Sequence, residues 1–275
     1  MEGKVGFIGF GSMGGVLLRT LLRYGGLVEQ EVVVATRSRD KLSGFISKYP
    51  GMKLERSNVR LAESCSTVFI CVGTADVKGI IEEIKPALVE GAHIIYISGG
   101  LTTDTVAKVY DGKITRITPS LICGTRNCVT LVHHNDHVTS EEKDRISGWL
   151  SKIGKVKEID EDQFEIGANL TSCAPAFMAA MMKYFAAEAV RHSRFTIEEA
   201  EEMVRTTMLG TIQLLIRRKI PFDSLIKRVA TEGGITEKGM KVIEEKLPDV
   251  FNELFLATLH KHDAIKADMG ELYSA

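Results

Sequence analysis

The 275-residue sequence lacks the features that mark several classes of protein. Lys and Arg total 35 and Asp and Glu 36, so no excess of one sign favours a nucleic acid or a membrane surface as partner. The least polar stretch, residues 170–190, contains Pro175, Lys183 and Glu188 and does not predict a membrane span. No basic and apolar leader precedes the first predicted strand, so we expect no signal peptide and a cytoplasmic protein.

The sequence also gives little sign of a disulfide framework or a metal site. Its cysteines are odd in number and form no C-x-x-C pair, which favours reduced thiols in a core or beside a site. They are Cys65, Cys71, Cys123, Cys128 and Cys173. His133, His134 and His137 have a spacing that suits zinc, but no cysteine or acidic cluster accompanies them, so we interpret them as a surface turn. We interpret His260 and His262 as a solvated helix face and predict no metal site.

A glycine motif close to the beginning of the chain carries most of the information about function. Val5, Phe7 and Ile8 predict a strand, residues 9–14 fit G-x-G-x-x-G, and apolar residues continue at helical spacing from position 16. In such a strand–turn–helix unit the first glycine allows a tight turn, the second lets the backbone approach a diphosphate, and the third lets the helix pack on the strand. The positive end of the helix dipole favours phosphate there, so we predict dinucleotide binding.

The end of the second predicted strand, residues 31–35, bears on the choice of dinucleotide. NAD-preferring sites place an acidic residue near this point to bind the ribose hydroxyls. This chain has Thr36, Arg37, Ser38 and Arg39 before the first acid, Asp40. Guanidinium and hydroxyl donors suit a 2′-phosphate, so we favour NADPH, with NADH as the alternative.

Further strands and helices alternate up to about residue 160, which predicts an α/β domain with a doubly wound, mainly parallel sheet. We expect strands at 67–72, 93–98, 113–118, 129–132 and 155–159, and helices at 42–49, after Ser57 and Asn58, at 77–88 and at 140–153. Several of the strands end in Gly, Ser or Thr. Ligands bind at this carboxyl edge of such sheets.

Beyond residues 160–162 no strand is evident, and we expect helices at 162–191, 196–218, 221–229 and 236–246, with a last one from 248 onward. Thr196 and Glu199 form a capping box, and Pro221 stands at a helix start. The first of these helices is apolar nearly all round, which favours burial against another subunit over a central place in a monomer. The predicted domains are therefore residues 1–160, which bind dinucleotide, and 161–275, which are all-helical and carry the substrate and dimer surfaces.

Several sequence blocks together resemble the pyrroline-5-carboxylate reductase family, and within it the branch of late competence proteins. Residues 7–14 match FIGxGxMG, residues 116–120 stand in place of Arg-x-Met-Pro-Asn, and residues 172–177 replace Gly-Ser-Gly-Pro-Ala-Tyr. Residues 207–210 match a T-x-x-G segment, and residues 231–236 correspond to Ser-Pro-Gly-Gly-x-Thr. The resemblance covers nearly the whole chain.

This resemblance implies an N-terminal Rossmann domain, a helical domain that intertwines with its twin in a homodimer, and in some members a ring of dimers. It implies hydride transfer from NADPH to 1-pyrroline-5-carboxylate, a cyclic imine, to give L-proline. The implied cofactor contacts are Gly9, Gly11, Ser12, Met13, Gly14, Thr36, Arg37, Ser38, Asn58, Cys71, Val72, Gly73, Ser98 and Gly99. The implied substrate contacts are Ser120, Thr231, Gly233, Gly234 and Thr236, with Thr236 as the catalytic residue.

Three positions depart from the family pattern. Gly73 replaces the Lys of Val-Lys-Pro, Ser120 replaces Asn, and Glu232 replaces a Pro beside the pocket for a carboxylate. Like charges in one pocket weaken binding. The sequence therefore leaves open an NADP(H)-binding accessory or regulatory protein with retuned or lost turnover, and a reductase of a related imine or hydroxy acid. For a β-hydroxyacid dehydrogenase, whose catalytic lysine would be Lys183, the expected Asn four residues on is Ala187.

Overall fold

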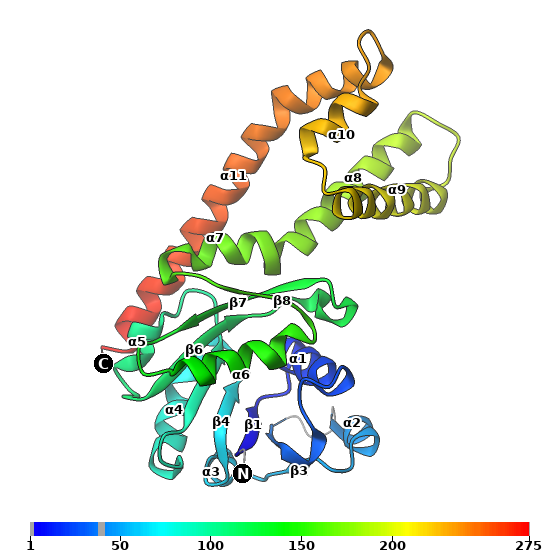
Figure 1. The fold of residues 1–275 in the computed structure, drawn as a ribbon. Helices are drawn as coiled ribbons and strands as arrows, with labels where there is room; N and C mark the ends of the chain where they lie inside the picture. Colours follow the sequence, from blue (N-terminus) through cyan, green and yellow to red (C-terminus); the bar gives the residue numbers. More distant parts are fainter. Residues whose placement is uncertain (1–2, 38–41, 275) are drawn as a thin grey trace. The chain divides into compact units, whose positions relative to one another are not determined.

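The computed structural model describes residues 3–37 and 42–274. The contacts divide the chain into two compact units (Figure 1). One unit holds the residues up to Cys173 together with those from Thr258 onward, and the other is Ala174–Ala257. The C-terminal segment of the chain therefore belongs to the same unit as its beginning.

The first unit contains a single eight-stranded sheet within the described residues, in the order β3-β2-β1-β4-β5-β6-β7-β8. Its neighbouring strands are parallel, except that β6 pairs with β7 antiparallel. The strands are β1 Lys4–Ile8, β2 Val32–Ala35, β3 Lys53–Leu54, β4 Cys65–Ile70, β5 His93–Ile97, β6 Lys113–Thr118, β7 Cys128–His134 and β8 Gly154–Glu158. This order, with β2 and β4 on either side of β1, is that of a doubly wound Rossmann sheet and confirms the predicted fold class.

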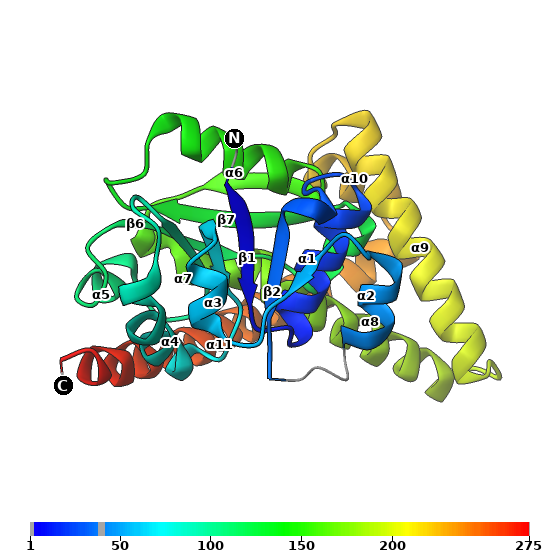
Figure 2. The same cartoon turned by 90° about the horizontal axis from the view of Figure 1, so that it is seen from below.

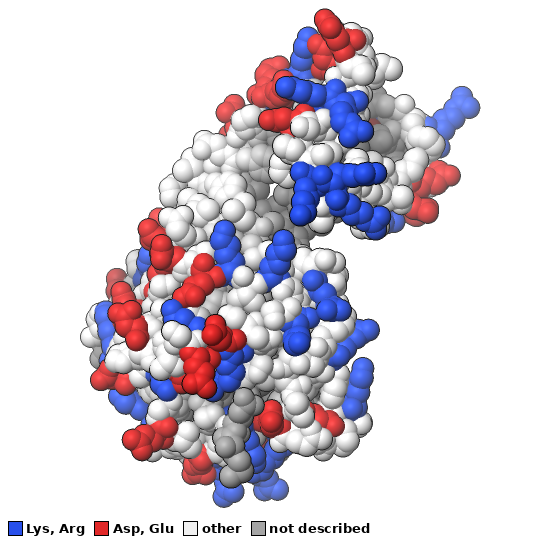
Figure 3. Space-filling model, in the orientation of Figure 1, with Lys and Arg blue, Asp and Glu red and all other residues white. Residues whose placement is uncertain are grey.

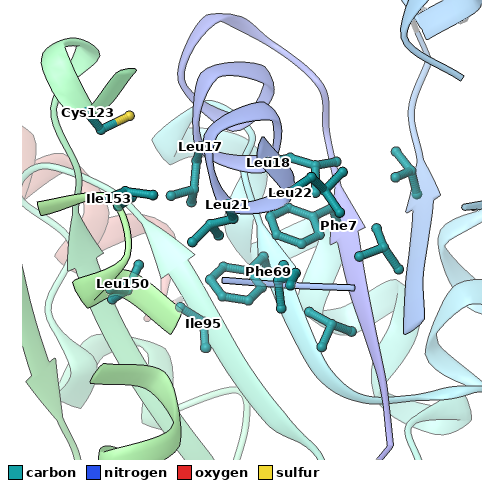
Figure 4. Packing of buried hydrophobic residues seen from close by; sticks show 14 of the residues in the cluster. Phe7, Leu17, Leu18, Leu21, Leu22, Phe69, Ile95, Cys123, Leu150 and Ile153 are labelled. Atoms are coloured by element: carbon teal, nitrogen blue, oxygen red, sulfur yellow. The ribbon is translucent and has the colours of Figure 1, made fainter. Parts of the chain in front are cut away.

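Helices cover both faces of the sheet (Figures 1 and 2). They are α1 Ser12–Arg23, α2 Ser43–Lys48, α3 Asn58–Ala62, α4 Val77–Ile84, α5 Thr103–Ala107, α6 Ser140–Ser151 and α7 Phe164–Ala168. On one face Leu17 and Leu21 of α1 pack with Leu150 of α6 against Phe7 and Phe69, whose rings stack 4.6 Å apart (Figure 4). The apolar runs of the central strands are thus buried from two sides, as parallel sheets require.

The second unit is helical, and the helices that form it are α8 Ala174–Arg191, α9 Ile197–Arg218, α10 Phe222–Val229 and the first part of α11 Ile235–Leu272. The predicted capping box is present, because the Glu199 N–H donates to Thr196 Oγ1 (3.2 Å) and the Thr196 N–H donates to Glu199 Oε2 (2.8 Å). In the single chain α8 leaves Tyr184 and Phe185 70% and 71% exposed. Such a surface is one that a second subunit would cover.

Two helix predictions need correction. The helices expected at 236–246 and from 248 onward are one continuous helix, α11, with Pro248 inside it. Proline removes one backbone donor and strains the preceding turn, which a helix of 38 residues tolerates. The helix expected at 162–191 is instead divided, since a π-helical segment, Asn169–Cys173, separates α7 from α8. Pro175, which cannot donate a hydrogen bond to the preceding turn, follows this segment.

The surface charges and the polarity of the helices are those expected from the nearly balanced charge of the sequence. On the face drawn in Figure 3, acidic and basic side chains are interspersed over the unit that carries the sheet. Among the described residues, no helix has the length and apolar character needed to cross a membrane.

Candidate functional site

A cavity of about 740 Å³ lies at the carboxyl ends of β1, β2 and β4. Its volume falls in the range of small-molecule sites, and its place is the switch point of the sheet, where ligands bind in this class of fold. The predicted cofactor contacts that line it are Gly9, Gly11, Ser12, Met13, Gly14, Thr36, Arg37, Asn58, Cys71, Val72 and Gly73. Ser98 and Gly99 are not among the lining residues, although Ile97 immediately before them is. Ser38 lies outside the described residues.

The three glycines of the motif differ in what surrounds them. Gly9 has a φ of 93°, and a Cβ there would lie 2.5 Å from the carbonyl oxygen of Cys71. A Cβ on Gly14 would lie 2.6 Å from the Cβ of Cys71, so this glycine sets the close approach of α1 to the end of β4. A Cβ on Gly11 would meet nothing within 4 Å in the part of the chain that the structure describes. Steric packing within the protein therefore requires glycine at positions 9 and 14, whereas at position 11 the space is left open to a ligand.

The N-terminus of α1 faces this open space. Its N-cap is Gly11, and in this described part of the chain no side chain caps the helix and no acidic residue occupies its first turn. Both Gly11 and Ser12 are exposed. The first N–H groups and the positive end of the helix dipole are thus available to an anion, so a dinucleotide diphosphate fits the residues present.

Polar side chains stand at the β2 side of the cavity. Arg37 Nη2 lies 3.6 Å from Asp76 Oδ2, and both side chains are largely exposed, at 92% and 56%. Asn58, the first residue of α3, donates from Nδ2 to Glu83 Oε2 (2.8 Å). Because exposed ion pairs contribute little, Arg37 can exchange its carboxylate for a phosphate at small cost.

Cys71, which follows β4, lines the cavity with a thiol of low reactivity. Burial raises the pKa of the Cys71 thiol to about 12, so at neutral pH this thiol is protonated. The carboxylates of Asp76 and Glu83 belong to the polar side described above. A site of this kind suits a reaction in which the bound cofactor supplies the chemistry and the protein binds and orients it.

The predicted substrate residues fall in two places. Thr231, Gly233 and Gly234 form a turn in the helical unit, and Gly233 has a φ of 73°. The Gly233 N–H donates to Glu237 Oε2 (2.7 Å) and the Gly234 N–H to the Thr231 carbonyl (3.0 Å), so both amides have acceptors within the protein. The hydrogen bond from Gly233 also lowers the pKa of the Glu237 carboxyl.

Thr236 lies inside the first turn of α11, which begins at Ile235, and is not its N-cap. It lines a cavity of about 460 Å³ with Gly210, Thr211 and Met240. Glu232 is exposed. Ser120 belongs to the other unit, where it follows β6, and its buried Oγ has no hydrogen-bond partner among the described residues.

Two interpretations of histidines are wrong in part, since they hold only for His137, in an exposed turn, and His260, on an exposed helix position. His133 and His134 are the last residues of β7 and not a surface turn; His134 is 7% exposed, and Thr115 Oγ1 lies 2.7 Å from its Nδ1. The side chain of His262 is only 16% exposed and its Nδ1 lies 2.8 Å from Glu165 Oε2, so it is not on a solvated face. Two patterns in the sequence could have placed these residues. Side chains of a strand alternate between its two faces at 133–134, and His262 stands about one helical turn before the apolar Ile265.

Sequence reasoning also missed the role of Arg116, which entered only as part of a motif. This arginine is fully buried on β6, between Glu161 and Glu165. A charged residue in the middle of a predicted buried strand must have charged partners, and this was the signal that could have located them.

Known proteins resemble this chain over its full length. Residues 161–265 match the family model of pyrroline-5-carboxylate reductase dimerisation, and residues 4–100 match that of the coenzyme F420-dependent NADP oxidoreductases. Pyrroline-5-carboxylate reductase 3 of Bacillus subtilis is 32% identical over 269 residues, which are 98% of each chain. ComE operon protein 4 of the same organism is 24% identical, over 94% of this chain and 95% of its own.

The fold agrees with these matches. The crystal structure of Plasmodium falciparum pyrroline carboxylate reductase with NADP bound superposes with a TM-score of 0.82 at 21% identity, covering 98% of each chain. The match to the Bacillus subtilis reductase exceeds what fold similarity alone produces, and it spans both the cavity and the helical unit. This chain belongs to the pyrroline-5-carboxylate reductase family.

Proposed function

We propose that this protein reduces 1-pyrroline-5-carboxylate to L-proline with NADPH. The observation that carries the proposal is the cavity at the switch point of the sheet, where Gly11 leaves open the space that a diphosphate needs. The full-length relative at 32% identity bears the name of this reductase. When bound, the nicotinamide supplies the hydride, and the remaining tasks are binding and orientation.

The residues of the chain divide these tasks. The turn from Gly9 to Gly14 and the N-terminus of α1 would hold the diphosphate, and Arg37 the 2′-phosphate. Residues 71–73 and 98–99 would border the nicotinamide half. Thr236 and the turn at 231–234 would bind the carboxylate and the ring nitrogen of the imine, and the Thr236 hydroxyl is the group that we assign to catalysis. Ser120, in the first unit, is a further substrate contact that the family resemblance implies.

The assembly in this proposal is a homodimer formed by the helical domain. The exposed Tyr184 and Phe185 of α8 and the match of residues 161–265 to a dimerisation domain support it. We propose residues 1–160 as the cofactor domain and 161–275 as the domain for substrate and dimerisation, with a ring of dimers as the larger form. Neither a nucleic acid nor a membrane is proposed as partner, and the proposed location is the cytoplasm.

The test is steady-state oxidation of NADPH by the purified protein in the presence of 1-pyrroline-5-carboxylate, with proline identified as the product. A Thr236→Ala variant should lose most of the turnover and retain NADPH binding, and Lys238→Ala, at an exposed position two residues further along α11, is a control for general damage to the helix. A protein that binds NADPH and turns over none of the substrate would refute the proposed activity.

A second candidate is an NADP(H)-binding accessory protein. The exposed Glu232, in the turn that would receive a carboxylate, favours it. Kinetics of Glu232→Pro and Glu232→Ala separate the cases. A large gain of turnover in both variants would indicate that the Glu232 carboxylate suppresses the reaction. A gain in neither variant would indicate that this carboxylate does not suppress it. A panel of cyclic imines and hydroxy acids tests for a related substrate.

A further inference from the structure

A buried guanidinium organises the carboxyl ends of β5 and β6. The Arg116 side chain is 1% exposed and lies over the ring of Phe164, 4.0 Å from its centroid. Its Nη1 donates to Glu161 Oε1 (3.2 Å), its Nη2 to Glu165 Oε1 (2.6 Å), and its Nε to the carbonyl oxygen of Ser98 (3.2 Å). A buried charge with this many good hydrogen bonds fixes the groups that surround it.

The two carboxylates of this cluster hold the turn that joins β5 to α5. Glu161 accepts hydrogen bonds from the N–H (3.0 Å) and the hydroxyl (2.6 Å) of Thr103. Glu165 accepts one from the N–H of Gly100 (3.2 Å). With the contact from Arg116 to Ser98, residues 98–103 are tied at three points. A turn that contains two successive glycines has a high conformational entropy, so it needs such external bonds to stay ordered.

The C-terminal part of α11 completes the cluster. His262 Nδ1 lies 2.8 Å from Glu165 Oε2, which is within ion-pair distance but not in hydrogen-bond geometry, and their side chains are 16% and 13% exposed. Gly100 has a φ of 77°, and a Cβ there would lie 2.7 Å from Cγ2 of Ile265. A Cβ on Gly99 would lie 3.6 Å from Cε1 of His262. The turn at 98–100 therefore packs directly against a segment about 160 residues further along the chain, within the same compact unit.

The same turn adjoins the cofactor cavity on its other side. Ile97 lines the cavity, and the hydroxyl of Ser98 donates to the hydroxyl of Thr74 (2.9 Å), just after the lining residues Val72 and Gly73. In a Rossmann site the adenosine half binds beside β2 and the nicotinamide half lies across the switch point. The end of β5 is thus on the nicotinamide side of the cavity.

We propose that His262 and Glu165 are positioning residues for the nicotinamide half of the cofactor. His262 packs against the second oxygen of Glu165 and against Gly99, and Glu165 with Arg116 holds the turn at 98–100 against the cavity. The C-terminal segment is then part of the cofactor site without touching the cofactor. This inference rests on the proposed function only in that it takes the cavity as the dinucleotide site.

Two probes separate this role from general stabilisation. NADPH contacts both ends of the site, whereas adenosine 2′,5′-bisphosphate lacks the nicotinamide half. We expect His262→Ala to weaken NADPH binding about tenfold, which corresponds to about 1.4 kcal/mol, and to leave the affinity for adenosine 2′,5′-bisphosphate unchanged. The matched control is His260→Ala, since His260 is exposed on the same helix two residues away and should affect neither.

Conservative variants test the geometry. Asn places its amide donor where Nδ1 of histidine lies, and Gln places it where Nε2 lies. We therefore expect His262→Asn to retain the affinity for NADPH and His262→Gln to lose it to the same extent as Ala. These two variants carry the test if His262→Ala does not fold.

Dissociation constants from protein and cofactor fluorescence give the result directly, without turnover. Equal NADPH affinity in wild type, His262→Ala and His262→Gln would overturn the inference, and so would an equal loss for both probes. A wild-type protein that binds neither probe would instead refute the dinucleotide site itself. Binding by the wild type with no effect of the variants would leave that site standing and remove only the role of His262.

Discussion

Substitution of Gly11 by alanine gives the sharpest test of the cofactor site, because this position separates folding from binding. A Cβ at Gly11 would meet no atom of residues 3–37 or 42–274 within 4 Å. The backbone of Gly11, with φ −73° and ψ −165°, is extended and lies in a region that alanine adopts freely. The new methyl group would therefore enter only the space in which we expect the diphosphate.

The expected effect on folding is close to zero. Alanine is a poorer N-cap than glycine by about 0.5–1 kcal/mol, and Gly11 is the N-cap of α1. Replacing glycine at a compatible position stabilises by about 0.4–1 kcal/mol, because the unfolded chain loses conformational freedom. The two contributions nearly cancel, so Tm should change by no more than about 2 °C.

The expected effect on binding is large. A methyl group in the path of the diphosphate displaces it from the N–H groups of α1, and the loss of even one hydrogen bond to a charged group weakens binding by about 1.5–3 kcal/mol. Gly11→Ala should thus raise the Kd of NADPH at least about tenfold. Fluorescence titration with NADPH and a thermal unfolding curve measure the two effects on one sample.

Gly14→Ala is the matched control with the opposite pattern. Its Cβ would lie 2.6 Å from the Cβ of Cys71, so overpacking should destabilise the fold by about 1–3 kcal/mol, less the gain in helix propensity. If Gly11→Ala bound NADPH as tightly as wild type, the assignment of the opening glycines to the diphosphate would be wrong. If Gly11→Ala lowered Tm as much as Gly14→Ala, the open space at this position would not exist in solution.

Three further predictions concern other parts of the chain. Burial lowers the pKa of His93 to about 3 and that of His134 to about 4, below the value of 6.5 for the unfolded chain. Protons therefore bind the unfolded chain more readily, so the free energy of unfolding is at its full value above about pH 6.5 and decreases as the pH falls. Urea unfolding at pH 7 and at about pH 5 should show a loss of about 2–4 kcal/mol, which a His134→Asn variant reduces. Arg37→Ala should weaken the binding of NADPH about tenfold more than that of NADH, and Asp76→Asn should strengthen NADPH about twofold, because the exposed pair is weak. Pro248→Ala should stabilise the protein by about 1 kcal/mol or more in urea unfolding, since it restores a donor inside α11.

The elements that the sequence predicted well are those whose signal is local. Residues 67–72 and 93–98 are continuous apolar runs bounded by Gly and Ser, and they became β4 and β5 within two residues. The glycine motif predicted a turn correctly, because the atoms that leave no room for a side chain at Gly9 and Gly14 lie within the turn or at the end of the adjacent strand. The short strand β3, of two residues, has too few residues to show any period and was missed.

The site was predictable to the extent that it is made by the strand ends. Gly9 to Gly14, Thr36 and Cys71 to Gly73 all line one cavity because parallel strands end at the same edge of the sheet. Ser98 follows the same rule but is 4% exposed, and its hydroxyl is directed to Thr74. Strand order indicates which edge a residue occupies, but not which way its side chain points once a neighbouring turn offers a hydrogen bond.

The least predictable feature is the return of the C-terminal segment to the first unit. Helical spacing from Ile265 places His262 on a buried face, but no residue near it identifies Glu165 as its neighbour, and Pro248 predicts a break between two helices. The reason for the return lies elsewhere: Met269 and Tyr273 fill the apolar face of the sheet beside α4, and Lys78 Nζ donates to the carbonyl oxygen of Leu272 (2.7 Å). Burial of two large side chains outweighs the donor lost at a proline, so the helix continues and carries His262 to the turn at 98–100. A cofactor site defined by local motifs thus acquires a distant member through the hydrophobic core, which a motif search does not detect.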